Sequence, residues 1–88
     1  MRLVFSESAW QQYLYWQTSD TAVLERLNAL IKQCKRTPFS GIGKPEPLKG
    51  ELRGFWSRRL THEDRLVYRV SGTGTAQQLE IAQCRFHS

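Results

Sequence analysis

The sequence predicts a two-layer α+β domain, in which a helical hairpin covers one face of a mainly antiparallel sheet in the order βααβββ. Apolar residues recur at helical spacing between residues 7 and 34. All three prolines and three of the six glycines fall within residues 38–50, which predicts an irregular segment. Beyond it, short polar turns separate apolar segments of strand length, as in an antiparallel meander.

The first half of the chain predicts one strand and two helices. Residues 2–5 read as a short strand, and Ser6 after them is a suitable helix N-cap. Aromatic and apolar residues at helical spacing predict a first helix over residues 7–17. A long apolar stripe from Val23 to Cys34 predicts a second helix, which should end at Lys35-Arg36, where cations favour the helix dipole.

The second half predicts an ordered loop without regular structure over residues 39–53, followed by three strands. The expected strands are residues 54–60, 65–70 and 78–85, separated by turns at residues 61–64 and 71–74. No repeat, low-complexity tract or linker interrupts the chain, so residues 1–88 are expected to form a single domain.

Composition points to a polyanionic partner. Thirteen Lys+Arg against eight Asp+Glu give a net charge of +5 and a pI near 9.7. A basic strand face that only meets water is an equally good reading of composition alone. The two cysteines, Cys34 and Cys84, are isolated and are expected to be buried reduced thiols. No apolar run reaches signal-peptide or membrane length, so a cytoplasmic protein without a membrane segment is expected.

Strand periodicity places charged residues on the sheet face away from the helices. Over residues 65–70 the even-numbered apolar residues should pack under the helices, leaving Arg65 and Arg69 on the open face. In the last strand Gln83, Arg85 and His87 are expected to share one side. Two neighbouring strands would thus bring Arg65 and His87 together.

Three residues could cleave RNA without a metal: the carboxylate of Glu46, the guanidinium of Arg65 and the imidazole of His87. Glu46 lies between two prolines, whose fixed φ angles would hold it in place. Each residue also has a plain interpretation, namely a solvated loop glutamate, a surface ion-pair arginine and a terminal histidine without a role. The aromatic residues Trp10, Tyr13 and Trp16 are assigned to packing.

A family resemblance favours the catalytic interpretation. The segments that carry it span nearly the whole chain: 38–39, 43–49, 54–59, 63–68 and 84–87, with Trp10 and residues 13–16 before them. Together they closely resemble the YoeB/Txe branch of the RelE-type toxins. The resemblance implies a RelE-like fold and a ribosome-dependent messenger-RNA endonuclease of a type II toxin–antitoxin pair, with no cofactor or metal.

The resemblance also implies roles and partners. Glu46 resembles the general base of the family, Arg65 its phosphate-stabilising arginine and His87 its general acid, giving a 2′,3′-cyclic phosphate. The predicted RNA-binding residues are Lys44, Lys49, Arg58, Arg59 and Arg85. The implied partners are a YefM/Axe-type antitoxin, the ribosome with its message, and operator DNA only through the antitoxin complex, while a homodimer is left open.

The C-terminus departs from the family pattern. Members usually end in His-Tyr, whereas this chain ends in His87-Ser88, and Phe86 stands where tyrosine is common. A serine cannot stack on a base, so Tyr68 or Phe86 would have to substitute. The alternative function is therefore a catalytically weakened homologue that acts as a ribosome- and antitoxin-binding module. A gyrase-poisoning relative of the same fold is a third reading, disfavoured by the presence of all three catalytic residues.

Overall fold

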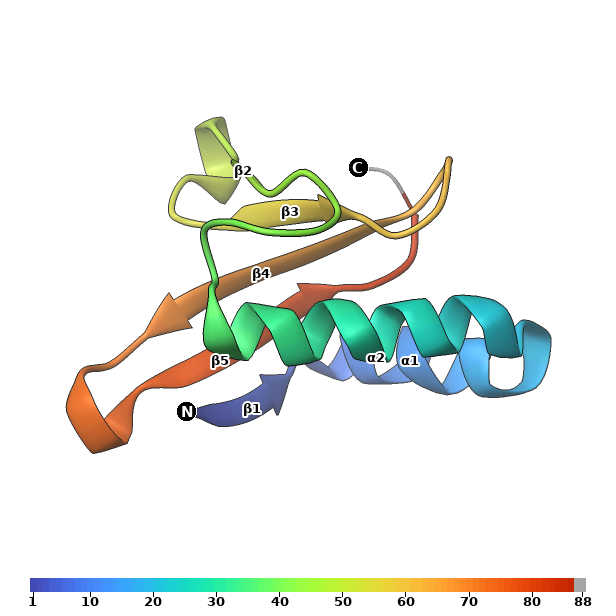
Figure 1. The fold of residues 1–88 in the computed structure, drawn as a ribbon, viewed down its shortest axis with the longest axis horizontal. Coiled ribbons are helices and arrows are strands. Elements are labelled where there is room, and N and C mark those ends of the chain that lie inside the picture. Colours follow the sequence, from blue (N-terminus) through green and yellow to red (C-terminus); the bar gives the residue numbers. More distant parts are fainter. Residues whose placement is uncertain (87–88) are drawn as a thin grey trace.

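Two helices lie on one face of a five-stranded sheet in the computed structural model of the protein, which describes residues 1–86 (Figure 1). The elements are β1 (Arg2–Phe5), α1 (Glu7–Ser19), α2 (Thr21–Arg36), β2 (Glu46–Pro47), β3 (Trp56–Arg59), β4 (Arg65–Ser71) and β5 (Gln78–Gln83). Short 3-10 turns occupy Gly50–Leu52 and Gly74–Ala76. The predicted two-layer α+β class is confirmed.

The strand order across the sheet is β1-β5-β4-β3-β2. Strand β1 pairs with β5 in parallel, and all the other neighbours are antiparallel, so the sheet is mainly antiparallel as expected. Strand β2 is a correction, because residues 39–53 were expected to lack regular structure. Glu46 pairs with Ser57 and Pro47 with Trp56. The sequence concealed this strand because proline lacks an N–H donor and reads as a turn residue.

Side-chain caps set the helix ends. The Ser6 hydroxyl accepts a hydrogen bond from Ala9 N at 3.1 Å and starts α1. Asp20 ends α1 and begins α2, since its N–H donates to the Trp16 carbonyl while its carboxylate accepts from the N–H groups of Ala22 and Val23. The first helix therefore continues to Ser19, two residues beyond the predicted end.

The core lies between the hairpin and the sheet. It consists of Ala9, Trp16, Leu27, Leu30, Ile31, Cys34, Leu60, Leu66, Tyr68, Leu79, Ile81 and Cys84. Both cysteines are buried and unpaired, as predicted. Trp16 also donates from Nε1 to the Cys84 carbonyl at 2.8 Å. Trp10 contradicts its assignment to packing in part, because it is 43% exposed and stacks on Tyr13 at the surface.

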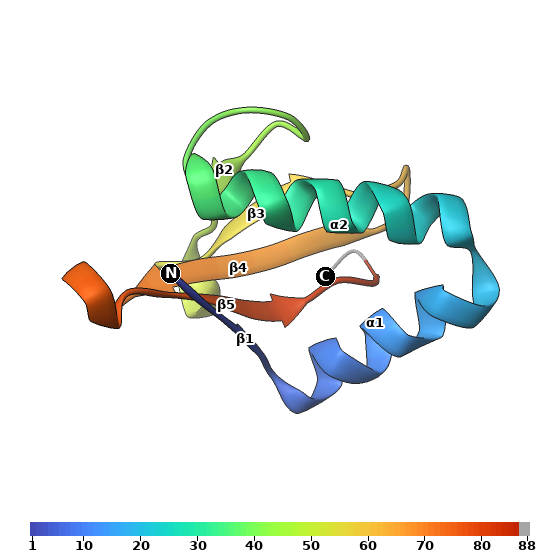
Figure 2. The ribbon, with the colours of Figure 1, turned by 60° about the horizontal axis from the view of Figure 1, so that its bottom comes forward.

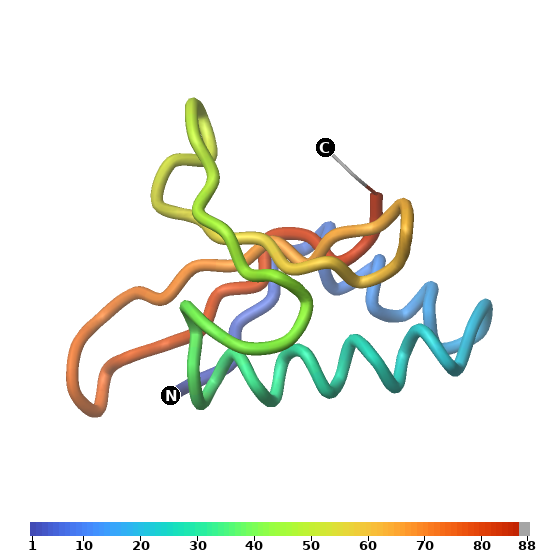
Figure 3. The backbone as a smooth tube through the Cα atoms, turned by 45° about the horizontal axis from the view of Figure 1, so that its top comes forward, coloured from blue at the N-terminus to red at the C-terminus, as the bar shows by residue number. Residues whose placement is uncertain are grey.

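The helices leave the other face of the sheet open. Figure 2 shows α2 crossing the sheet, while α1, which precedes it, runs from the end of β1 to meet the start of α2. In Figure 3 the yellow-green segment through β2 and the dark red end of the described chain both rise from the side of the sheet opposite the helices. Within the described residues, no helix is long and apolar enough to cross a membrane.

Candidate active site

Strand register places a row of side chains, three of them polar, on the sheet face away from the helices, and two of its members, Ser57 and Val67, are buried. Directly opposed residues on paired strands point to the same side, and one such row is Glu46, Ser57, Val67 and Gln83. Arg65 pairs with Arg59 one step along the same face. The structure thus places Glu46 and Arg65, the two predicted catalytic residues that it describes, on one face.

A bulge in β5 is needed for this arrangement. Tyr68 pairs with Ile81 and Val67 with Gln83, so Ala82 is an extra residue between the two pairs. Ile81 therefore remains in the core while Gln83 reaches the open face. The sequence gives no clear signal for this switch, because the apolar alternation of the strand continues up to the bulge.

Backbone contacts on both sides fix Glu46. Before it, Arg59 N donates to the Gly43 carbonyl at 2.7 Å, and after it Leu48 N donates to the Phe55 carbonyl at 2.9 Å. Its side chain is exposed and makes no hydrogen bond with the described residues. A carboxylate placed in this way can accept a proton from a substrate.

Arg65 carries a charge that no described carboxylate neutralises. Its Nη1 donates to the backbone carbonyls of Asp64 at 3.2 Å and Thr61 at 3.4 Å. The residue is half-buried at the start of β4. These contacts orient the guanidinium and leave its other N–H groups available to an anion such as phosphate.

Asp64 ties the C-terminal segment to Arg65. One carboxylate oxygen accepts from the Thr61 hydroxyl at 2.7 Å, and the other accepts from Phe86 N at 2.6 Å. The Phe86 carbonyl in turn accepts from Arg65 N at 2.9 Å and from the Gln83 side chain at 3.1 Å. The sequence analysis did not identify Asp64 as a residue that holds the C-terminal segment. Its position in a tight turn was the one signal available. His87, the predicted general acid, lies outside the described residues.

Three of the predicted RNA-binding residues, Lys44, Lys49 and Arg59, are exposed. Lys44 adopts a φ of 51°, an unusual conformation for a residue other than glycine. Their contact with RNA stays a prediction.

Arg58 is a correction, since its side chain is 0% exposed and faces the core rather than RNA. Its guanidinium donates to five oxygens: Tyr68 Oη, Gln33 Oε1 and the carbonyls of Ile42, Thr37 and Ser40. Strand alternation explains the difference, because Arg58 pairs with core residue Leu66 while its neighbour Arg59 pairs with Arg65.

Arg85 also departs from its predicted position. Strand β5 ends at Gln83, so the expected alternation does not continue to Arg85. Its guanidinium carbon lies 3.5 Å from the ring centre of Tyr15 in α1 and 4.5 Å from that of Phe86. Arg85 therefore reaches toward the helical layer instead of sharing the open face with Gln83.

Tyr68 and Phe86, the two residues considered as substitutes for a terminal tyrosine, lie in different environments. Tyr68 is buried and its hydroxyl donates to the Pro38 carbonyl at 2.6 Å, so it cannot substitute for a terminal aromatic residue. Burial raises the pKa of Tyr68 to about 12, although the Arg58 cation opposes the shift. Phe86 is 50% exposed beside Arg65.

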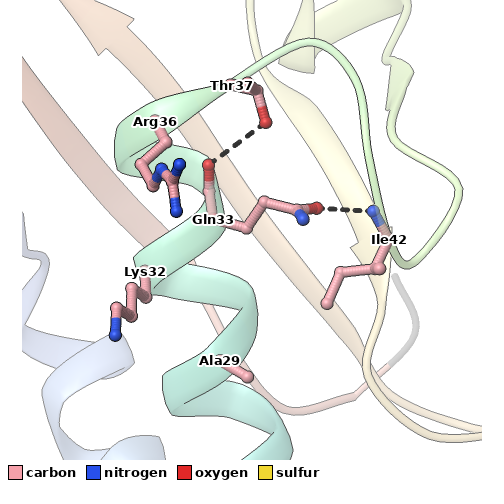
Figure 4. A pocket seen from close by; sticks show the side chains of 6 residues that line it. All are labelled: Ala29, Lys32, Gln33, Arg36, Thr37 and Ile42. Carbon is pink, nitrogen blue, oxygen red and sulfur yellow. Dashed lines mark hydrogen bonds between the residues drawn. The ribbon is translucent and has the colours of Figure 1, made fainter.

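A hollow of about 370 Å³ lies away from this site, at the C-terminal end of α2 (Figure 4). Its lining residues are Ala29, Lys32, Gln33, Arg36, Thr37 and Ile42. Figure 4 shows Gln33 crossing the hollow to bind Ile42 N, at 2.5 Å. Among residues 1–86, no group of three His, Cys, Asp or Glu side chains could hold a metal ion.

Comparison with known proteins agrees over the whole length of the chain. The family model described as "YoeB-like toxin of bacterial type II toxin-antitoxin system" matches residues 5–88. The chain is 55% identical to "Toxin YoeB" of Escherichia coli strain K12 over 87 residues, covering 99% of each protein.

Solved structures give the same result. "YoeB/ParE toxin from Agrobacterium tumefaciens" superposes with a TM-score of 0.96 at 57% identity and covers 100% of both chains. A YoeB–YefM complex from Staphylococcus aureus gives a TM-score of 0.88 at 38% identity, covering 100% of this chain and 98% of that one. A YoeB dimer from S. aureus also superposes, with a TM-score of 0.88 at 39% identity, covering 100% of this chain and 98% of that one.

Proposed function

The chain belongs to the YoeB-like toxins of bacterial type II toxin–antitoxin systems, and we propose that it is a ribosome-dependent messenger-RNA endonuclease. One observation carries the proposal: the exposed Glu46 carboxylate shares the open sheet face with Arg65, whose charge no described carboxylate neutralises. A proton acceptor and a fixed cation are two of the three groups that phosphodiester cleavage requires.

In the proposed mechanism the RNA supplies its own nucleophile. Glu46 takes the proton of the 2′-hydroxyl, whose oxygen then attacks the adjacent phosphorus. Arg65 stabilises the negative charge of the phosphorane. His87 donates a proton to the departing 5′-oxygen, leaving a 2′,3′-cyclic phosphate and a 5′-hydroxyl. Each task is assigned to a side chain of this protein.

Two macromolecular partners follow from the proposal. The ribosome presents the message to the open face, in the cytoplasm, and Lys44, Lys49 and Arg59 contact its phosphates. A YefM-type antitoxin, like the partner named for the S. aureus relative, covers this basic face and blocks cleavage. A second copy of the chain is a further partner, as in the dimeric relative.

Primer extension on ribosome-bound message tests the function. We expect cleavage by the purified protein, and a loss of about 10²–10⁴-fold in Glu46→Gln, as for removal of a general base. Glu51→Gln, which alters another exposed glutamate of the same loop, is the matched control and should cleave normally. End-group analysis should give a cyclic phosphate with excess chelator present, under conditions that keep ribosomes intact. A 5′-phosphate end would contradict the mechanism.

The second candidate is a binding module, favoured by Ser88 in place of the usual terminal tyrosine. Under the endonuclease proposal, Ser88→Tyr should increase cleavage, since misplacement of a substrate costs about 10²-fold. If neither the wild type nor Ser88→Tyr cleaves although both bind ribosomes and antitoxin, the binding-module function is the correct one.

A further inference from the structure

Arg58 is a buried cation that contacts no described carboxylate. All five of its N–H groups donate to neutral oxygens, at distances between 2.6 and 3.1 Å. Three of these oxygens are backbone carbonyls of the segment 37–42, which leads from the end of α2 toward β2. A single side chain thus donates hydrogen bonds to three of the six backbone carbonyls of a segment that has no regular structure.

Neighbouring groups complete the contacts of this loop. Gln33 Oε1 accepts from both Arg58 and Ile42 N, so it joins the guanidinium to the backbone of the loop. The Tyr68 hydroxyl accepts from Arg58 Nε and donates to the Pro38 carbonyl. We call Arg58, with its hydrogen bonds to this loop, the clamp. Gly43 packs directly against it, because a Cβ at residue 43 would lie 3.1 Å from Arg58 Cβ and 3.0 Å from Leu30 Cδ2.

The loop ends next to Glu46. Only Gly43, Lys44 and Pro45 separate Ile42 from Glu46, and the Gly43 carbonyl is itself bonded to Arg59 N. Because the Glu46 carboxylate has no side-chain hydrogen bond with the described residues, its position depends on the course of this backbone. A shift of the loop would be transmitted to the carboxylate.

We propose that Arg58 is a positioning residue, which holds the loop of residues 37–43 in the conformation that places the Glu46 carboxylate on the open face. The effect on catalysis rests on the proposed function, whereas the stabilisation of the loop by Arg58 does not. A lysine cannot replace Arg58, since one ammonium offers three donors from a single point and cannot span oxygens on all sides of a planar fork.

The experiment compares Arg58→Gln and Arg58→Lys with Arg26→Gln. Arg26 is the matched control, because its guanidinium also donates to two backbone carbonyls of the β3 end, those of Leu60 and Arg59, each at 2.8 Å. It makes no hydrogen bond with the loop of residues 37–43. For each variant we measure amide hydrogen exchange of the non-proline residues between 40 and 48, together with the kcat and KM of ribosome-dependent cleavage.

In Arg58→Gln we expect faster exchange at the amides of Ile42, Gly43, Lys44, Glu46 and Leu48, with β4 and β5 still protected. We expect kcat to fall about 10²-fold at nearly constant KM, because misplacing a catalytic group costs about that much. Arg58→Lys should recover only part of kcat. Arg26→Gln should keep the exchange of the loop and the kcat of wild type, even where its melting temperature falls.

A second variant keeps the proposal testable if Arg58→Gln does not fold. Gln33→Met retains the length of the side chain and the buried cation, but removes the oxygen shared by Arg58 and Ile42. Faster loop exchange and a lower kcat are expected here also. If hydrogen exchange of the loop is unchanged in the folded variants, Arg58 does not hold the loop. If exchange is faster but kcat stays at the wild-type value, the loop does not position Glu46. If wild type does not cleave at all, the proposed function fails while the exchange data still decide the clamp.

Discussion

Arg58 and Arg59 are adjacent in the sequence and lie in opposite environments on the two faces of β3. Arg58 is completely buried and surrounded by five neutral oxygens. Arg59 is exposed on the open face, opposite Arg65. An arginine therefore stabilises a loop on one face of β3, and another arginine is accessible to solvent on the other face. Only the strand register decides which residue lies on which face.

The open face itself has two different ends. Arg69 forms an ion pair with Glu80 at 3.1 Å and lies over the Phe55 ring. Arg65, on the same side of β4, contacts only backbone carbonyls among the described residues. A neutralised arginine attracts phosphate weakly. We therefore expect anion binding, under the proposed function, to be concentrated at the Arg65 end, beside Phe86.

Among the variants of this face, the largest loss of cleavage should come from removing the arginine of β4 that pairs with no described carboxylate. We expect Arg65→Ala to lower ribosome-dependent cleavage by about 10²–10³-fold, equal to about 3–4 kcal/mol of transition-state stabilisation. Arg69→Ala, its matched control on the same face, should change cleavage by less than about threefold, since its charge is already paired. Equal losses in the two variants would show that the face acts only through its overall charge.

Substitutions on the two faces of β3 should differ in their effect on the free energy of unfolding. We expect Arg58→Gln to lower the free energy of unfolding by about 3 kcal/mol, because several buried carbonyls lose charged donors. Arg59→Gln should change it by no more than about 0.5 kcal/mol, as for most surface substitutions. Urea denaturation at neutral pH measures both. A similar cost at the two positions would mean that the carbonyl cage contributes little.

Alkaline pH should weaken the helix-facing side of the sheet. Burial raises the pKa of Tyr68 from 10.0 to about 12 and that of Cys84 from 9.0 to about 12. The unfolded chain loses these protons first, so stability is complete below about pH 9 and falls as pH rises toward 12. For Tyr68 the loss is about 2–3 kcal/mol. Denaturation between pH 8 and 11 should show a shallower alkaline decline in Tyr68→Phe than in wild type.

The smallest effect is expected at the neutralised end of the open face. Hydrogen bonds from Ser71 and Arg69 lower the pKa of Glu80. Its contribution is thus present above the ordinary carboxyl pKa and is lost as pH falls through the lowered value. Because the pair is partly exposed, Glu80→Gln should cost less than about 1 kcal/mol at neutral pH, and less still in high salt. A larger cost would assign Glu80 a structural role like that of Arg58.

The sequence by itself determined the class of the fold and every α-helix and strand except β2. Ser6 and Asp20 begin the helices through local caps, and the spacing of apolar residues from Val23 to Cys34 marks the face of α2 that is buried. Alternation along β4 correctly placed Arg65 and Arg69 on the open face. These features depend on residues near one another in the chain, so their periodicity is visible in one dimension. The two flanking prolines alone leave open that Glu46 is a solvated loop residue, and the family resemblance is what makes it a catalytic candidate.

Only the tertiary structure decided what each charged residue contacts. The burial of Arg58 depends on pairing with β4 and on carbonyls 16–21 residues away. The pairing of Glu46 with Ser57 creates β2, and a bulge at Ala82 returns Gln83 to the open face. Asp64 meets Phe86 across 22 residues. Such contacts join segments far apart in sequence, and their geometry is set by register, which composition and periodicity do not specify.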